Sequence, residues 1–173
     1  NGVTLLEGTA KFEDEGTVRV EHGGEGQGAE TMTFEHCIVA TGSRPIELPG
    51  FDFADDPILD SAAALDLDAV PDRLVVIGAG YIGMELSTVF ADLGSDVTVV
   101  EMLDGVLPGY EDDVSRVVRK RAESKGVDFH FSEGASGWRD AADGGIVVTT
   151  ETEDGEESTY GADRVLVAVG REP

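Results

Sequence analysis

A glycine-rich turn between two apolar runs places the strongest constraint on how this chain can fold. The stretch reads VVIGAGYIGMELSTVFADLGSDVTVVE and covers residues 75–101. An apolar run leads into three glycines, helix-forming residues follow, and a second apolar run ends at Glu101. A strand, a tight turn, a helix and a second strand in this order are typical of a βαβ unit with parallel strands. The stretch therefore predicts an α/β fold.

The glycine spacing G-x-G-x-x-G, placed between a strand and a helix, matches the fingerprint of dinucleotide-binding domains. Gly78 allows the tight turn, Gly80 lets a pyrophosphate approach the backbone, and Gly83 lets the helix pack closely on the strand. The helix N-terminus then offers free N–H groups to the phosphates. The residues of this turn that we predict to bind NAD are Gly78, Ala79, Gly80, Tyr81, Ile82 and Gly83.

Glu101 ends the second apolar run, near the spacing of about 20 residues expected for the acid that binds the adenosine ribose. A carboxylate there can accept hydrogen bonds from both ribose hydroxyls and would repel a 2′-phosphate. Glu101 therefore favours NAD over NADP as the cofactor. The alternative is a solvated acid at the end of a strand.

Strand and helix signals alternate through the second half of the chain. Strands are predicted at 74–77, 97–100, 127–131 and 164–170, helices at 81–93 and 112–125, and a strand pair over 145–162. This order predicts an NAD-binding domain over 71–173, with three layers, a parallel sheet and a β-meander crossover.

The first part of the chain reads as strands at 3–12 and 17–21, a glycine-rich turn at 22–30, and a strand ending the segment 31–42. That last strand is continuously apolar, so we expect it to be parallel and buried on both faces, with Cys37 in the core. Its end, HCIVATGSRP, is echoed by RVLVAVGREP at the end of the chain. The echo predicts that one structural unit is used twice, with the second copy complete.

Three stretches, VATGSRPIELPG, the segment 71–113 and RVLVAVGREP, resemble the flavoprotein disulfide reductases, and within them the members that oxidise dihydrolipoamide. The resemblance implies that residues 1–70 are the back part of a second, FAD-binding domain. The residues that it places near FAD are Ala10, Thr41, Gly42 and Ser43. It adds Glu85, Ala135 and Gly170 to the NAD site, and it gives Tyr81 the position of an aromatic lid.

The resemblance also implies a function for the longer parent protein. Electrons would pass from dihydrolipoamide, carried by the lipoyl-bearing component of a 2-oxo acid dehydrogenase complex, through a disulfide and FAD to NAD. The parent would be a cytoplasmic homodimer. This chain has no C-x-x-x-x-C pair and no catalytic histidine motif, so we expect it to be a fragment without catalytic residues of its own. The alternatives are another reductase of the same family, of the mercuric reductase or NADH oxidase type, and a non-catalytic NAD-binding module.

Charge and composition argue against several other classes of protein. The 36 acids against 12 basic residues leave a net charge of −24, which disfavours nucleic acid as a partner. Acids spread evenly along the chain are typical of proteins from salt-loving organisms, where salt screens self-repulsion. The alternative is an acidic mesophilic protein whose charged surface is simply solvated. No apolar stretch is long enough to predict a membrane span, and the three histidines and one cysteine show no metal-ligand spacing.

Overall fold

The computed structural model describes residues 2–23, 28–142 and 144–173, which belong to two compact units. The units are Asn1–Gly42 and Ser43–Pro173. The sequence predicts a division after residue 70 instead. The segment 43–70 belongs to the larger unit because it contributes a strand and a helix to it, β5 (Ile58–Leu59) and α1 (Ser61–Leu65).

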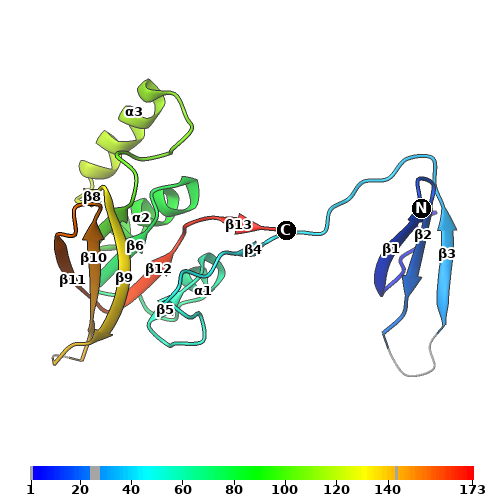
Figure 1. Ribbon diagram of the computed structural model, residues 1–173, viewed down its shortest axis with the longest axis horizontal. Helices are drawn as coiled ribbons and strands as arrows, with labels where there is room; N and C mark the ends of the chain where they lie inside the picture. Colours follow the sequence, from blue (N-terminus) through cyan, green and yellow to red (C-terminus); the bar gives the residue numbers. More distant parts are fainter. Residues whose placement is uncertain (1, 24–27, 143) are drawn as a thin grey trace. The chain divides into compact units, whose positions relative to one another are not determined.

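A five-stranded parallel sheet forms the centre of the larger unit (Figure 1). Its order is β5, β12 (Arg164–Val167), β6 (Arg73–Ile77), β7 (Asp96–Glu101) and β8 (Asp128–Phe131). Helix α2 (Tyr81–Leu93) connects β6 to β7, and α3 (Asp112–Glu123) connects β7 to β8. The predicted α/β fold with a parallel sheet is confirmed.

The sheet is covered by helices on one face and by an antiparallel meander on the other (Figure 1). The meander consists of β9 (Glu133–Asp140), β10 (Ile146–Thr152) and β11 (Glu157–Ala162), and it forms the crossover from β8 to β12. Successive side chains of β6 alternate between the faces. Val76 packs in the helix-side core with Phe90, whereas Val75 packs in the meander-side core with Val148. The predicted three layers follow from this alternation.

The ends of the helices agree closely with the sequence. Helix α2 ends before Gly94, whose φ of 104° gives the left-handed cap that glycine adopts without strain. Helix α3 ends at Glu123 rather than at the predicted residue 125, and Gly126 follows with a φ of 93°. Strand β9 was not predicted, because Gly134 and Gly137 interrupt its strand pattern. It forms because it pairs with β10 along its length.

The smaller unit is an antiparallel meander of β1 (Thr9–Asp14), β2 (Thr17–Glu21) and β3 (Ala29–Thr33). The predicted turn at 22–30 includes residues 24–27, which lie outside the described residues. Both copies of the echoed pattern thus begin with a three-stranded meander.

The segment after β3 does not form the strand that the sequence predicts. Ile38 and Val39 are 92% and 64% exposed, and Cys37 is exposed rather than buried. A parallel strand buried on both faces needs neighbouring strands and a covering layer on each side. Among the described residues of the smaller unit only the antiparallel meander is present, so nothing there covers this segment.

The ends of the two echoed segments pair with each other. Strand β4 (Arg44–Pro45) runs antiparallel to β13 (Arg171–Glu172). Arg44 Nε lies 2.9 Å from Glu172 Oε1, and Arg171 Nε donates a hydrogen bond of 2.8 Å to Ser43 Oγ. The polar residues that follow Gly42 and Gly170 therefore bind residues 43–45 to the last residues of the chain.

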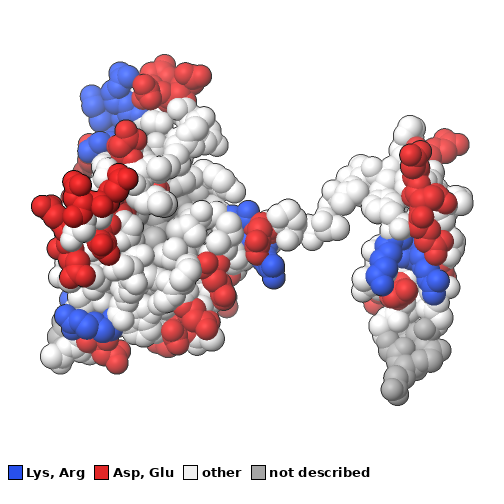
Figure 2. Space-filling model, in the orientation of Figure 1, with Lys and Arg blue, Asp and Glu red and all other residues white. Residues whose placement is uncertain are grey.

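Acidic side chains cover more of the visible surface than basic ones, and one group of basic side chains lies over α3 (Figure 2). The basic group on and after this helix consists of Arg116, Arg119, Lys120, Arg121 and Lys125. Within the described part of the chain, no helix is both long and apolar enough to cross a membrane.

Candidate dinucleotide site

A cavity of about 580 Å³ opens where β6, β7 and β12 end. In open parallel sheets, ligands bind in the crevice outside the carboxyl ends of the strands, at the point where the strand order reverses. Strand β6 lies at that point, between β12 and β7. The predicted site residues that line the cavity are Gly78, Gly80, Tyr81, Ile82, Glu101, Ala135 and Gly170.

Two glycines of the fingerprint are required by the fold itself. Gly78 has a φ of 103°, and a Cβ on it would lie 2.6 Å from the carbonyl oxygen of Ala168 on the neighbouring chain segment. Its N–H donates a hydrogen bond of 2.8 Å to the carbonyl of Val100. A Cβ on Gly83 would overlap the carbonyl oxygen of Gly78. These positions explain the tight turn and the close approach of α2 to β6.

Gly80 differs from the other two glycines. It caps the N-terminus of α2 with a φ of −69°, which any residue can adopt, and a Cβ there would meet nothing within 4 Å. The protein itself therefore does not need a glycine at this position. The bare backbone leaves space beside the first N–H groups of the helix, and this space fits a pyrophosphate.

Glu101 is 7% exposed, and both of its carboxylate oxygens are held by the backbone. Oε2 accepts a hydrogen bond of 2.7 Å from the N–H of Ala79, and Oε1 accepts one of 2.9 Å from the N–H of Leu103. The acid is therefore not a solvated residue at a strand end. Each carboxylate oxygen has two lone pairs, so a fixed Glu101 can still accept hydrogen bonds from a ribose on the cavity side.

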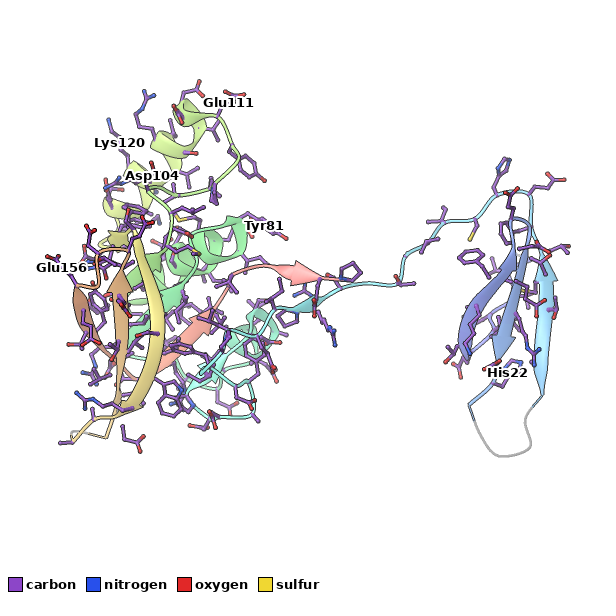
Figure 3. The ribbon with its side chains drawn as sticks, in the orientation of Figure 1. His22, Tyr81, Asp104, Glu111, Lys120 and Glu156 are labelled. Atoms are coloured by element: carbon purple, nitrogen blue, oxygen red, sulfur yellow. The ribbon has the colours of Figure 1, made fainter. Side chains whose placement is uncertain are left out.

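Three further predicted residues line the cavity from different elements. Tyr81 stands at the first turn of α2 and is 55% exposed (Figure 3). Gly170 follows β12 with a φ of 142°. Ala135, which the resemblance adds to the NAD site, lies on β9 of the meander. The meander therefore forms one wall of the cavity.

Other predicted residues lie outside the cavity lining. Ala79 is buried, and its N–H is committed to Glu101. Glu85 is exposed on α2 and does not line the cavity. The residues predicted near FAD are Ala10 on β1, Thr41 and Gly42 in the segment without a strand, and Ser43, which accepts the hydrogen bond from Arg171. None of these four lines the cavity, and their relation to FAD stays a prediction.

Sequence reasoning missed part of the lining. The missed residues include Leu48, Met102, Leu103, Pro108, Glu133, Gly134, Val169 and Arg171. Arg171 belongs to the echoed motif, so the echo was a signal for it. Glu133 had no such signal, because the strand that carries it was not predicted.

Glu133 takes part in a hydrogen-bond network behind the cavity wall. Its Oε2 accepts hydrogen bonds of 2.7 Å from Thr150 Oγ1 and 2.8 Å from the hydroxyl of Tyr160. Burial, and then the hydrogen bond to the Glu133 carboxylate, raise the pKa of Tyr160 to about 12. The hydroxyl therefore stays protonated and donates to Glu133 throughout the physiological range.

The parallel sheet, the glycine turn at its carboxyl edge and the buried acid define a dinucleotide-binding domain of the α/β type. Comparison with known proteins gives the family. The chain belongs to the pyridine nucleotide-disulphide oxidoreductases, whose family model matches residues 1–173.

Similar proteins support this assignment. Over its whole length the chain is 70% identical to a dihydrolipoyl dehydrogenase of the halophile Haloferax volcanii, of which it spans 36%. Among solved structures, LpdA of Mycobacterium tuberculosis matches 99% of this chain and 37% of its own, with 28% identity and a TM-score of 0.79. A water-forming NADH oxidase of Lactobacillus brevis, bound to NADH, matches 94% of this chain and 37% of its own, with 25% identity and a TM-score of 0.67.

Proposed function

We propose that this chain is the NAD-binding part of a dihydrolipoyl dehydrogenase. The cavity carries the proposal: it combines a side-chain-free Gly80 at a helix N-terminus with a buried, backbone-held Glu101. The high identity to the Haloferax volcanii enzyme supports the choice within the family. Because the chain spans about a third of that relative, the activity belongs to a longer protein.

The chain's own residues would divide the dinucleotide between them. The pyrophosphate would lie against Gly80, and the adenosine ribose would donate its hydroxyls to Glu101. Ala135 would contact the adenosine side, while Tyr81 and Gly170 would border the nicotinamide side. NAD, when bound, supplies a hydride acceptor. Glu85, exposed on α2, would belong to the NAD site of the longer protein, as the resemblance implies.

The smaller unit would be part of a second domain of the longer protein. The smaller unit would belong to its FAD-binding domain, with Ala10, Thr41 and Gly42 near the flavin. The sequence also assigns residues 43–70, including Ser43, to that domain, although this segment packs in the larger unit here. The large exposed fractions of Ile38 and Val39 support this reading, because an exposed apolar segment of this kind is normally covered by another part of a protein. The longer protein would be a cytoplasmic homodimer. It would oxidise dihydrolipoamide on the lipoyl-bearing component of a 2-oxo acid dehydrogenase complex.

Cofactor choice tests the proposed site. Calorimetric titration should show that the protein binds NADH much more tightly than NADPH, because Glu101 would repel a 2′-phosphate. Glu101→Ala should weaken NADH binding by about 1.5–3 kcal/mol, the range for hydrogen bonds to a charged group. Glu101→Arg should shift the preference toward NADPH.

Glu151→Ala is the control, because it removes an exposed acid of β10 that does not line the cavity. It should leave both affinities unchanged. Equal affinity of the unmutated protein for NADH and NADPH would contradict the proposal.

A further inference from the structure

Glu133 lines the same cavity as the acid proposed to bind the ribose. The two acids are joined through Leu103, whose N–H donates to Glu101 Oε1 and whose carbonyl accepts a 3.0 Å hydrogen bond from the N–H of Ser132. Ser132 has a φ of 60°, a left-handed conformation that is rare for residues other than glycine. This turn from β8 into β9 brings Glu133 into the lining of the cavity that Glu101 also lines.

The Glu133 side chain is held by one oxygen only. Oε2 accepts the hydrogen bonds from Thr150 and Tyr160. Thr150 is fully buried, and the Tyr160 ring packs against His130 with 4.5 Å between ring centroids. Among the described residues, none donates a hydrogen bond to Oε1. The network therefore fixes the carboxylate and leaves one acceptor oxygen for a ligand.

The position of this acceptor points to the base at the adenosine end of the ligand. The base is bonded to the ribose, so it lies beside whatever holds the ribose hydroxyls. Ala135 follows Glu133 by two residues on β9, so both side chains share one face of the strand. Ala135 offers a small apolar surface to a flat ring, and Glu133 offers an acceptor at its edge.

We propose that Glu133 selects adenine by accepting a hydrogen bond from its exocyclic amino group. The inference rests on the proposed NAD site and deepens it. A base with a carbonyl at the same position would turn an oxygen toward the carboxylate. A site built around a fixed polar partner rejects such an analogue, because the partner is left unpaired.

The test compares NADH with the reduced hypoxanthine dinucleotide, in which a carbonyl replaces the amino group of the base. Nucleotide fluorescence on titration with the purified protein gives both dissociation constants without any need for catalysis. The unmutated protein should bind NADH about tenfold more tightly than the analogue. Glu133→Gln should abolish or reverse this preference, because the amide oxygen would keep the hydrogen bonds from Thr150 and Tyr160 and leave the NH2 group to donate to the carbonyl of the analogue.

Two comparisons make the result specific. Glu151→Gln makes the same chemical change at an exposed position of β10, outside the cavity, and should keep the tenfold preference. The melting temperature of each variant shows whether the loss of charge at Glu133 has disturbed the Tyr160 and Thr150 network rather than the ligand.

The outcomes separate the two proposals. If the unmutated protein binds neither nucleotide, the proposed NAD site is wrong. If it binds both with equal affinity, or if folded Glu133→Gln keeps the preference for adenine, the NAD site stands and the role of Glu133 is overturned.

Discussion

Residues 36–45 and 164–173 have similar sequences, and each follows a three-stranded antiparallel meander. Only the second forms a buried strand. In β12, Val165 and Leu166 are fully buried between β5 and β6, whereas Ile38 and Val39 of the first copy are mostly exposed. The meanders differ in the same way: β10 buries Val148 against the sheet, and every residue of β1 is exposed.

The difference shows that an apolar sequence forms a buried strand only where neighbouring strands pair with it and other elements cover it. Parallel strands must be paired on both sides and covered on both faces. In the larger unit, β5 and β6 pair with β12, and the helices and the meander cover it. The described residues of the smaller unit provide no such neighbours, so the similar segment at Ile38 and Val39 remains exposed and forms no strand.

The largest expected effect is a contrast in core packing between the copies. Leu166→Ala should lower the free energy of unfolding of the larger unit by about 2–5 kcal/mol, since it leaves a cavity beside fully packed neighbours. Ile38→Ala, at a side chain that is 92% exposed, should change stability by less than about 0.5 kcal/mol. Chemical denaturation followed by circular dichroism measures both. Similar losses in the two variants would mean that the first copy is packed after all.

A matched pair of glycines separates backbone conformation from packing. Gly78 and Gly42 both have positive φ, at 103° and 77°, so alanine is strained at either position. Only at Gly78 would the new Cβ also press against a backbone carbonyl, that of Ala168. Gly78→Ala should therefore lower the free energy of unfolding by about 1–3 kcal/mol more than Gly42→Ala does. The melting temperature of the Gly78 variant should accordingly be the lower of the two. Equal shifts would show that the close contact at Gly78 is not tight.

Two aspartates, one in each unit, allow the stability of the two units to be compared at acid pH. The side chain of Arg73 lowers the pKa of Asp163, which joins β11 to β12, through a hydrogen bond of 2.8 Å. The N–H of Gly16 similarly lowers the pKa of Asp14, the last residue of β1. A carboxyl group whose pKa is lower in the folded state stabilises the fold at pH values above its pKa in the unfolded state, near 3.9. This contribution is lost as the pH falls through the pKa of the folded state.

Asp163→Asn should therefore cost about 1 kcal/mol at pH 7, and the difference from the unmutated protein should shrink below about pH 4. Asp14→Asn, at a fully exposed turn, should cost less at every pH. Thermal melting from pH 7 to pH 3 gives both curves. A cost for Asp163→Asn that is the same at pH 3 and pH 7 would rule out the ion pair as its source.

Local patterns predicted the larger unit well, because its elements carry their own signals. The glycine spacing and Gly94 gave both ends of α2, and the apolar runs gave β6 and β7. Strand β9 was missed because its glycines hide a strand that depends on pairing with β10. Glu133 was missed for the same reason.

The cavity could be predicted only in part. Glu101 and Gly80 follow from a spacing that reflects ligand chemistry. The backbone hydrogen bonds that hold Glu101, and the network around Glu133, depend on how loops distant in sequence meet. The open segment at Ile38 was predicted as a strand because its composition matches that of β12, and composition does not report the missing neighbours.

The central claim is that the dinucleotide site lies wholly within the larger unit, and hydrogen–deuterium exchange with and without NADH tests it most directly. We expect NADH to slow exchange at 78–83, 101–103 and 133–135, and to leave 2–23 and 28–42 unchanged. Protection confined to the smaller unit, or no protection around Gly80 and Glu101 at saturating NADH, would contradict the account.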